Sequence, residues 1–521
     1  MAVGSLGIQP IIGLEVHVQL ATRTKLWCGC ELVFGAPPNE RVCPVCLGLP
    51  GALPALNRQA VELSILAGLA LNCQIAPETR WDRKSYYYPD LPKNYQISQY
   101  DQPLCFDGYF ELPHDGAIRK VRIRRAHVEE DAGKNTHELE RGTGVDLNRA
   151  GTPLLEIVTE PDLRSADEAR EFAAQLQRLV KYLRVSNANM QMGQMRFEPN
   201  VNLSIRQDGR EHRTPIVEVK NLNSFRALHG AIAHEIRRQQ EAWLETGEAA
   251  RVGNKLNRGW DDQREVTVPQ REKEEAHDYR YFPDPDLLPV RIDAAHVAEL
   301  REHMPELPLP RTERFISEYK LPACDAPALV DCRATAELLD DAAEAGGDRP
   351  TLGRHFLSFW AKLANERETT IAGIGVCARH MAALANLARE GQVNATAAAQ
   401  IAGVMAERAD QLLAGRRRPS EAECGAAFEQ FDGDGLDPLA IAREQRLLQS
   451  RDEDQIAAWV RAALDANEPA VRDALENPKK IDKARGFLAG QVMKLSRGQA
   501  DPRLVSELIE ARLAALAKEP E

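Results

Sequence analysis

The chain has 521 residues, 43% of them hydrophobic and 28% charged, which is typical of a globular protein with about two to four domains. No apolar run approaches the roughly 18 residues that a membrane-spanning helix needs. The first residues lack a basic segment followed by a long apolar one, so a cytoplasmic protein is expected. The formal net charge of −12 repels polyanions at long range, and a nucleic-acid partner would therefore require local basic patches.

The first half of the chain alternates short β-rich stretches with turn residues and a few helical segments. Polar and apolar residues alternate with period two in several stretches between residues 11 and 289, which favours antiparallel strands with one solvated face. The remainder of the chain is rich in Ala, Leu and Glu, which predicts helices. A stretch rich in charge, Pro and Gly divides these helices into two groups. The expected fold class is α+β, with an N-terminal antiparallel-sheet domain at 1–295, a helical domain at 296–437 and a helical tail domain at 438–521.

Four cysteines have the spacing of a metal site, C-x-C-x12-C-x2-C, and they are Cys28, Cys30, Cys43 and Cys46. Two such knuckles place four thiolates around Zn2+ and leave no open position for catalysis, so a structural zinc site is expected. The alternative is four unconnected reduced thiols. The remaining cysteines lack partner spacing and are expected to be small buried side chains: Cys73, Cys105, Cys324, Cys332, Cys377 and Cys424.

Several carboxylates and histidines lie on predicted strands. Glu15 and His17 are two residues apart, so a strand directs both side chains to one face. Glu156 stands amid apolar residues, where a carboxylate is costly unless a cation pairs with it. A further acidic group in RAHVEEDAGK consists of His127, Glu129, Glu130 and Asp131. Oxygen ligands held on several strands suit Mg2+. Salt bridges are an equal alternative, for which the chain offers Arg124, Arg125, Lys134 and Arg149.

Basic and aromatic residues follow the same part of the chain, in WDRKSYYYPDLPKNYQISQYDQPL, EVKNLNSF and KEEAHDYRYFPDPDLLP. The tyrosines suit stacking on a base or on the terminal adenosine of a nucleic acid, and equally suit a core or an interface. Basic side chains can hold the phosphates of a cofactor. The candidates are Lys84, Arg149, Arg196, Lys220 and Arg280.

Two short motifs do not predict nucleotide binding. AGIGVCA at 372–378 satisfies G-x-G-x-x-A but lies in a predicted helical region. DAGKNT at 131–136 lacks the earlier glycine of a P-loop. The chain also lacks a Ser-rich amidase signature and a Cys nucleophile in a glutaminase context.

Long motifs occur in register along nearly the whole sequence. They are IGLEVHVQL, CGC with CPVCLGLPGALPALN, YYYPDLPKNYQISQYDQPL, HVEEDAGK, DLNRAGTPLLEIVTEPD, VKNLNSFRAL, EEAHDYRYFPDPDLLP and GFLAGQVMKLSRGQADPRLVSELIEARL. With this set and order, the chain resembles the family of the B subunits of aspartyl/glutamyl-tRNA amidotransferases.

The resemblance implies a cradle-shaped catalytic domain related to glutamine synthetase, followed by a helical domain and a tail that contacts tRNA. It implies that ATP phosphorylates the side-chain carboxylate of Glu or Asp misattached to tRNA(Gln) or tRNA(Asn). Ammonia from the amidase, which is the A subunit, then displaces phosphate, and the small C subunit makes the assembly a heterotrimer. The implied cofactors are ATP, Mg2+ and structural Zn2+. By motif match, the Mg2+ and phosphoryl-transfer cluster consists of Glu15, His17, Glu130 and Glu156.

Two segments depart from the family pattern. Phe197, Glu198 and Pro199 replace Cys-Asp and a small residue after Arg196, and 256–258 reads Leu-Asn-Arg where an acidic residue, Thr and Arg are usual. The tail carries a local excess of basic residues that suits phosphate contact, with a solvated helix face as the alternative. These residues are Lys479, Lys480, Lys483, Arg485, Lys494, Arg497 and Arg503.

Two other functions remain open at this point. The same metal cluster would suit a ligase that joins a small-molecule carboxylate to an amine, although the long helical part argues against it. A non-catalytic tRNA-binding scaffold is the other alternative.

Overall fold

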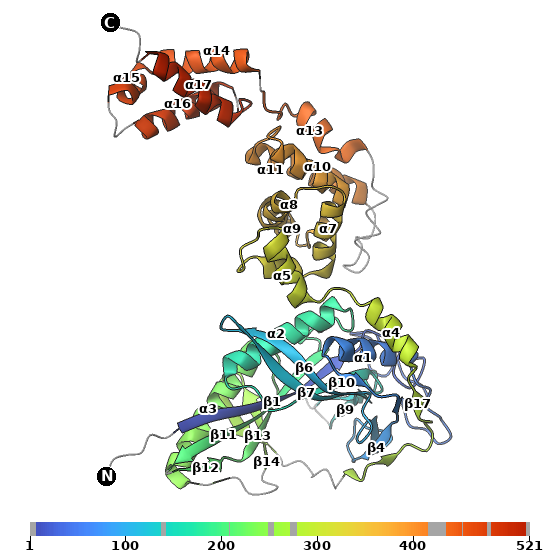
Figure 1. Cartoon of the computed structure of the whole chain (residues 1–521). Coiled ribbons are helices and arrows are strands. Elements are labelled where there is room, and N and C mark those ends of the chain that lie inside the picture. The colour runs from blue at the N-terminus through green and yellow to red at the C-terminus, as the bar shows by residue number, and fades with distance from the viewer. Residues whose placement is uncertain are drawn as a thin grey trace, which may run out of the picture. The chain divides into compact units, whose positions relative to one another are not determined.

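The computed structural model describes residues 7–136, 142–207, 209–247, 249, 255–270, 279–414, 434–450, 452–476, 481–496 and 498–516. The chain divides into two compact units, Met1–Leu307 and Pro308–Glu521 (Figure 1). The first unit contains strands and helices, and the second is largely helical. Among the residues described, no helix is both long enough and apolar enough to cross a membrane.

A large mixed sheet forms the centre of the first unit. Its strands follow the order β15-β14-β13-β11-β1-β10-β7-β6-β2, with β12 paired to β11. Strands β13 and β14 run parallel because helix α3 connects them as a crossover. The other pairs of neighbouring strands in this sheet are antiparallel, so the expected antiparallel sheet is corrected to a mixed one. The strands are β1 (Gly7–Gln19), β2 (Gln74–Ile75), β6 (Cys105–His114), β7 (Ala117–Glu130), β10 (Pro153–Thr159), β11 (Met195–Gln207), β12 (Arg210–Arg213), β13 (Ile216–Lys220), β14 (Lys255–Asp261) and β15 (Val266–Pro269).

Helices cover one face of this sheet. Val16 of β1 is buried in a core that includes apolar residues of all three covering helices. Its neighbours Glu15 and His17 point to the opposite face, because successive side chains of a strand alternate. The hydroxyl oxygens of Ser165 and Ser224 accept backbone N–H bonds at the starts of α2 and α3. The covering helices are α1 (Arg58–Ala70), α2 (Ala166–Tyr182) and α3 (Phe225–Thr246).

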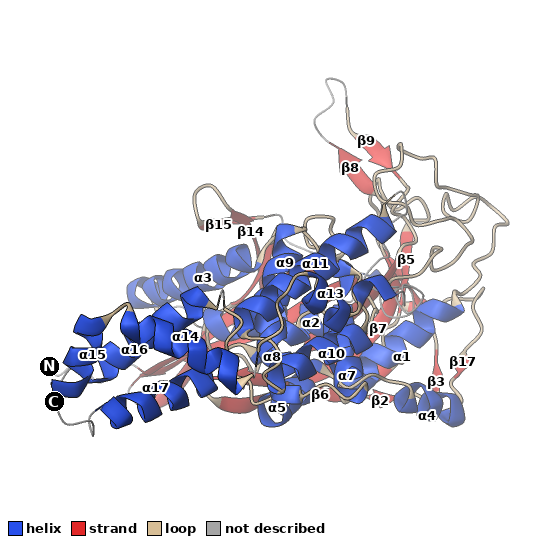
Figure 2. Ribbon diagram, turned by 90° about the horizontal axis from the view of Figure 1, so that it is seen from above, coloured by secondary structure: helices blue, strands red, loops and turns tan. Residues whose placement is uncertain are grey.

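Three smaller sheets complete the strands of the first unit. One joins β4 (Asp82–Ser85), β5 (Tyr95–Ser98) and β16 (Phe282–Pro283), and another joins β3 (Glu78–Thr79) and β17 (Val290–Arg291). The third is the hairpin of β8 (Lys134–Thr136) and β9 (Gly144–Asp146), which projects from the large sheet (Figure 2). The pairing of β16 with β4 brings two aromatic segments together, since Tyr281 stacks on Tyr100 with ring centroids 4.3 Å apart.

The first unit extends past the predicted boundary at 295. Helix α4 (Ala294–Glu302) contacts α1, and its apolar residues Val297 and Leu300 pack against the core of the sheet. Met304 and Leu307 continue this contact. The boundary between the compact units therefore follows the end of these apolar contacts and lies at Leu307 and Pro308.

The second unit is built from helices that bury apolar side chains against one another. Helices α14 to α17 share a core of their own, in which Val505, Ile509 and Leu513 of the last helix are buried. The AGIGVCA segment at 372–378 begins with the short helix η3 (Ala372–Ile374) and ends at the first residue of α10, so it lies between helices rather than between a strand and a helix. The helices are α5 (Pro308–Glu318), α6 (Ala326–Val330), α7 (Arg333–Glu344), α8 (Arg349–His355), η2 (Phe356–Trp360), α9 (Ala361–Glu366), α10 (Ala378–Arg389), α11 (Ala395–Leu413), η5 (Asp434–Leu436), α13 (Pro438–Glu444), α14 (Glu453–Asp465), α15 (Glu468–Glu476), α16 (Ile481–Leu495) and α17 (Pro502–Leu516).

The contact of α2 with the sheet gives a test of the core. Phe172 is fully buried, and its ring meets that of Phe110 edge-on at 5.4 Å. We expect Phe172→Ala to lower the free energy of unfolding of the first unit by about 3–5 kcal/mol, because it leaves a cavity. Urea denaturation followed by tryptophan fluorescence measures this change. The exposed Phe34 is the matched control, and an equal loss in Phe34→Ala would contradict the assignment of the core.

Candidate functional site

The face of the sheet away from the helices carries a row of polar side chains. His127 of β7 lies opposite Glu156 of β10, Glu156 lies opposite His17 of β1, and His17 lies opposite Arg196 of β11. Paired residues of antiparallel strands point to the same face. Four neighbouring strands therefore present two imidazoles, a carboxylate and a guanidinium side by side.

A group of potential metal ligands lies in this row. One ligand atom each from His17, Glu129 and Glu156 lies within 4.8 Å of the others. His17 Nε2 is 3.7 Å from Glu129 Oε1 and 3.4 Å from Glu156 Oε2. From the other side, His127 Nε2 is 3.8 Å from Glu129 Oε2 and 3.6 Å from Glu156 Oε2. Two imidazoles thus flank a pair of carboxylates.

The charged side chains of this cluster stabilise one another's ionised forms. Burial opposes ionisation of Glu156, yet His127 and His17 hold its pKa well below the usual range. Burial and Glu156 oppose ionisation of Glu129, whose pKa His127 and Lys84 nevertheless lower. Burial would lower the pKa of His17, but these carboxylates raise it to about 9. Both carboxylates are therefore ionised and available to a cation at neutral pH.

Glu130, which motif match placed in this cluster, lies on the other face of the sheet. Its Oε1 accepts bonds from Lys93 Nζ at 2.5 Å and from the backbone N–H of Ile97 at 2.8 Å. Burial raises its pKa despite this partner. The prediction for Glu130 is corrected because strand alternation directs Glu129, one residue earlier, to the polar face.

Glu15 lies on the polar face, as the strand pattern predicted, but not among the ligand atoms that approach one another. Its Oε1 accepts a bond from Asn200 Nδ2 at 3.0 Å, and Lys255 Nζ is 3.9 Å away. The structure therefore brings together His17 and Glu156 of the four predicted cluster residues, with Glu15 two positions along the same strand.

Three of the predicted cofactor-binding cations lie beside the cluster. Burial would lower the pKa of Lys84, but Glu129 and Glu156 raise it above its usual value. Arg196 Nη2 is 3.0 Å from both oxygens of Asp131, and Arg149 Nε donates to the same carboxylate at 2.8 Å. One carboxylate thus holds two guanidinium groups, while Glu198 and Glu129 also act on Arg196 and Asp90 on Arg149.

The other two predicted cations have different surroundings. Lys220 Nζ is 3.0 Å from Glu198 Oε2 and 3.1 Å from Glu218 Oε1. Glu198 belongs to the segment that departs from the family pattern, and its carboxylate remains on the polar face opposite Lys220. Arg280 is exposed, with a backbone φ of 46°. Its contact with a cofactor stays a prediction.

Glu129, His127 and Asp131 belonged to the acidic group that the sequence suggested, but the motif match placed only Glu130 of that group in the cluster. A signal for the first two was present, because Val128 is apolar and its neighbours on a strand must point the other way. Asp131 follows the end of β7, where alternation no longer applies. Its contacts come from side chains that are 18 and 65 residues away along the chain.

The four spaced cysteines come together. One Sγ atom from each of Cys28, Cys30, Cys43 and Cys46 lies within 4.8 Å of the others. Cys46 Sγ is 3.5, 3.7 and 3.8 Å from those of Cys28, Cys43 and Cys30. Thiolates held at about 2.3 Å from a tetrahedral Zn2+ lie about 3.8 Å from one another. The donor set and its spacing therefore fit a closed structural zinc site.

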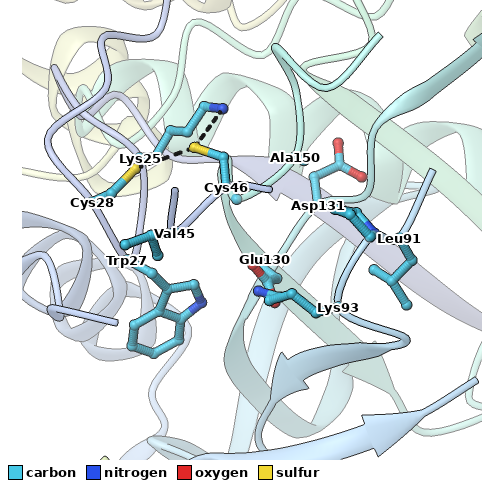
Figure 3. Close-up of a pocket in the computed structure, with 12 residues that line it drawn as sticks. Lys25, Trp27, Cys28, Val45, Cys46, Leu91, Lys93, Glu130, Asp131 and Ala150 are labelled. Carbon is cyan, nitrogen blue, oxygen red and sulfur yellow. Dashed lines mark hydrogen bonds and ion pairs between the residues drawn. The ribbon is translucent and has the colours of Figure 1, made fainter. Parts of the chain in front are cut away.

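A buried lysine accompanies these thiols. Lys25 is fully buried, and its Nζ donates to Cys46 Sγ at 3.3 Å and to the carbonyl of Leu147 at 3.2 Å. The hydrogen bond from Cys28 and the charge of Lys25 outweigh burial and lower the pKa of Cys46 to about 4. A small pocket separates these groups from Lys93 and Glu130, which lie side by side (Figure 3).

The remaining cysteines have mixed exposure. Cys73 and Cys105 are buried, as expected, whereas Cys332 and Cys377 are half-buried. Cys324 is exposed, which corrects its prediction, because it lies in the turn before α6. Cys424 lies outside the described residues.

Two family models match separate parts of the chain. Residues 10–298 match the GatB/GatE catalytic domain, and residues 420–513 match the GatB domain. The sheet and its polar face thus define a catalytic domain of the GatB/GatE class.

Relatives are similar along almost the whole length. The B subunit of the aspartyl/glutamyl-tRNA(Asn/Gln) amidotransferase of Caldicellulosiruptor bescii is 41% identical over 507 residues, which cover 96% of this chain and 98% of the relative. The corresponding proteins of Thermoanaerobacter sp. (strain X514) and Rhodopirellula baltica are 40% and 42% identical, covering 97% and 96% of this chain and 99% and 96% of the relatives. The chain belongs to the family of the B subunits of aspartyl/glutamyl-tRNA(Asn/Gln) amidotransferases, which confirms the resemblance of its motifs.

The thiol cluster predicts the metal content of the chain. We expect elemental analysis to find one zinc ion per wild-type chain and none after Cys46→Ser, because three thiolates and a hydroxyl no longer form a closed site. Cys73→Ser removes a buried thiol outside the cluster and is the control. Zinc retained at full content in Cys46→Ser would rule out this assignment.

The alternation of side chains along β7 predicts that two neighbouring substitutions affect metal affinity differently. We expect Glu129→Gln to weaken the binding of Mn2+, used as a probe for Mg2+, by about tenfold or more, because it removes a charged ligand. Glu130→Gln should leave the Mn2+ affinity within about twofold, since that carboxylate faces Lys93. Isothermal titration with zinc-loaded protein measures both. Equal weakening by the two variants would contradict the assignment to opposite faces.

Proposed function

We propose that this chain is the component of a tRNA-dependent amidotransferase that activates the side-chain carboxylate of Glu-tRNA(Gln), of Asp-tRNA(Asn) or of both. ATP phosphorylates the carboxylate, and ammonia displaces the phosphate to give Gln-tRNA(Gln) or Asn-tRNA(Asn). The observation that carries this proposal is the group of half-buried His17 and buried Glu129 and Glu156 beside Lys84. Family membership supplies the class of substrate.

The residues of the polar face have distinct parts in this chemistry. His17, Glu129 and Glu156 would hold Mg2+, which neutralises charge on transferring phosphoryl groups when it is bound. Lys84 and the guanidinium groups on Asp131 orient phosphate oxygens. A free carboxylate is a poor acyl donor, whereas an acyl phosphate has a good leaving group. The site therefore has to bring two anions together, and its cations offset their repulsion.

The proposed architecture assigns the sheet to a cradle related to glutamine synthetase. A polar face that bears imidazoles and carboxylates supports this relation. We further assign 296–437 to a helical domain and 438–521 to a tail that contacts tRNA. Arg485 and Arg503 of the tail pair with acidic neighbours, whereas Lys479, Lys480 and Arg497 lie outside the described residues. Contact between this tail and tRNA stays a prediction.

The proposed partners supply ammonia and complete the assembly. The relatives are named as B subunits, and such a name belongs to a multi-subunit enzyme. We assign the release of ammonia to an amidase as the A subunit and the third position of a heterotrimer to a small C subunit, in the cytoplasm. Structural Zn2+ at the four cysteines, together with ATP and Mg2+ at the polar face, completes the set of cofactors.

An amidation assay separates the proposed function from its alternatives. Misacylated tRNA, ATP and an ammonium salt are supplied to the chain with and without partner proteins, and the amide is quantified after deacylation. ATP-dependent Gln or Asn on tRNA supports the proposal. Amidation of free glutamate would indicate a small-molecule ligase instead, and tRNA binding without turnover would indicate a scaffold.

Glu156 provides the sharpest variant. We expect Glu156→Gln to lower ATP-dependent amide formation at least about a hundredfold, because it removes a charged ligand from the metal group. Its affinity for tRNA, measured by filter binding, should change little, since this side chain is buried. The control is Glu160→Gln, just past the end of the same strand, where the carboxylate pairs with the exposed Arg124. Normal amide yield in Glu156→Gln would remove this residue from the mechanism.

A further inference from the structure

Lys25 is a buried lysine that joins the cysteine cluster to another segment of the first unit. Its side chain is fully buried. Its Nζ donates to Cys46 Sγ at 3.3 Å (Figure 3), and it also donates to the carbonyl of Leu147 at 3.2 Å. A lysine is almost never fully buried without a partner for its charge. The position of Lys25 therefore points to a lasting anion at the cysteine cluster.

A zinc site with four thiolates supplies that anion. Four thiolates outweigh the two positive charges of Zn2+, so the loaded site has a net charge of about −2. The ammonium group of Lys25 would offset part of this charge, and its hydrogen bond would orient the Cys46 thiolate. Without the ion, four thiolates would repel one another, and the cluster cannot keep all of them close together. Zinc occupancy should therefore determine how firmly Lys25 is held.

The second contact of this lysine lies on the segment that carries a candidate phosphate ligand. Leu147, which accepts the bond from the lysine, is two residues before Arg149. Arg149 Nε donates to the carboxylate of Asp131 at 2.8 Å. Backbone bonds complete the link, since Leu26 N–H donates to the carbonyl of Gly151 at 2.8 Å and Gly151 N–H donates to that of Asp131 at 2.9 Å. A shift of the lysine would therefore be passed to Arg149 over two residues.

The loop between the two cysteine pairs holds the same segment from a second side. Asn39 Oδ1 accepts a bond from the backbone N–H of Leu147 at 2.8 Å. Arg41 N–H donates to Asn148 Oδ1 at 2.8 Å, and Asn148 Nδ2 donates to the carbonyl of Pro37 at 2.7 Å. One ion bound by both cysteine pairs would close this loop at its ends and reduce its freedom to move. Zinc would therefore restrain the segment through this loop as well as through the buried lysine.

We propose that Lys25 is a positioning residue through which zinc occupancy sets the place of Arg149. The zinc-loaded chain consequently binds a nucleoside triphosphate more tightly than the zinc-free chain, because a guanidinium group holds phosphate as a fork only in the correct orientation. The coupling is reciprocal, so a bound triphosphate raises the affinity for zinc. This inference rests on the proposed function, which supplies the triphosphate. A lysine that only stabilised the knuckle would change the zinc affinity but not its dependence on nucleotide.

Two binding measurements on the full chain, alone and with its partner proteins, test the proposal. The affinity for the non-hydrolysable ATP analogue AMP-PNP with Mg2+ is measured by isothermal titration before and after a chelator removes zinc. The affinity for zinc is measured by competition with a chromogenic chelator, with and without the analogue. We expect each affinity of the wild type to rise about fivefold or more when the other ligand is bound. Affinities that are equal in both states would overturn the proposal.

Variants then assign the coupling to the lysine. We expect Lys25→Met, which keeps the length of the side chain and loses its charge, to bind the analogue with the same affinity whether or not zinc is bound. If circular dichroism shows that this variant does not fold, the shorter and uncharged Lys25→Gln is measured in its place, with the same expectation. Glu31→Gln is the matched control, because its exposed carboxylate lies in the same knuckle and pairs with the side chain of Arg41. It should keep the wild-type coupling.

The outcomes separate this inference from the function on which it rests. Coupling that survives in the folded lysine variant would overturn the role of Lys25. Intact amidation together with absent coupling would overturn the inference and leave the proposed function standing. Coupling without amidation would do the reverse.

Discussion

Two carboxylates buried beside each other on one face of a sheet are the constraint on which this site depends. Glu129 and Glu156 would be costly to ionise without partners, since burial of an unpaired charge outweighs most single contacts in a protein. His17, His127 and Lys84 make ionisation favourable. The carboxylates are consequently ionised before a cation binds, and their charge can attract that cation from the solvent.

The two faces of the sheet explain how such a group is held in place. The helices bury apolar side chains against one face, and this core fixes the register of the strands that carry the polar row. A slip of one residue would move His17 and Glu156 into the core. The cysteine knuckle and Lys93 stand on the other side of β7, so adjacent residues Glu129 and Glu130 belong to separate environments. Rigidity of the strands therefore sets the geometry of the site.

Sequence reasoning predicted the elements better than it predicted the members of the site. The spacing of Cys28 and Cys46 and the alternation of Glu15 and His17 are local signals, and the structure agrees with both. The crossover that makes β13 and β14 parallel depends on the placement of α3, which no local pattern encodes. Glu130 was assigned by motif match, although the apolar Val128 already required its side chain to point away from His127. The contacts of Asp131 join segments distant in the chain, so only the folded structure reveals them.

The negative charge of the whole chain and the proposed anionic substrates are compatible because charge is distributed unevenly. Many carboxylates among the described residues pair with neighbouring cations, as Glu160 does with Arg124, and have little effect beyond about a Debye length of 8–10 Å. Asp131 instead holds two guanidinium groups with one carboxylate. A phosphate that reaches this place can contact these two guanidinium groups in a partly buried setting, where screening by salt is weak. Local geometry therefore outweighs the formal charge of −12, and the strands that position these few cations determine where an anion can bind.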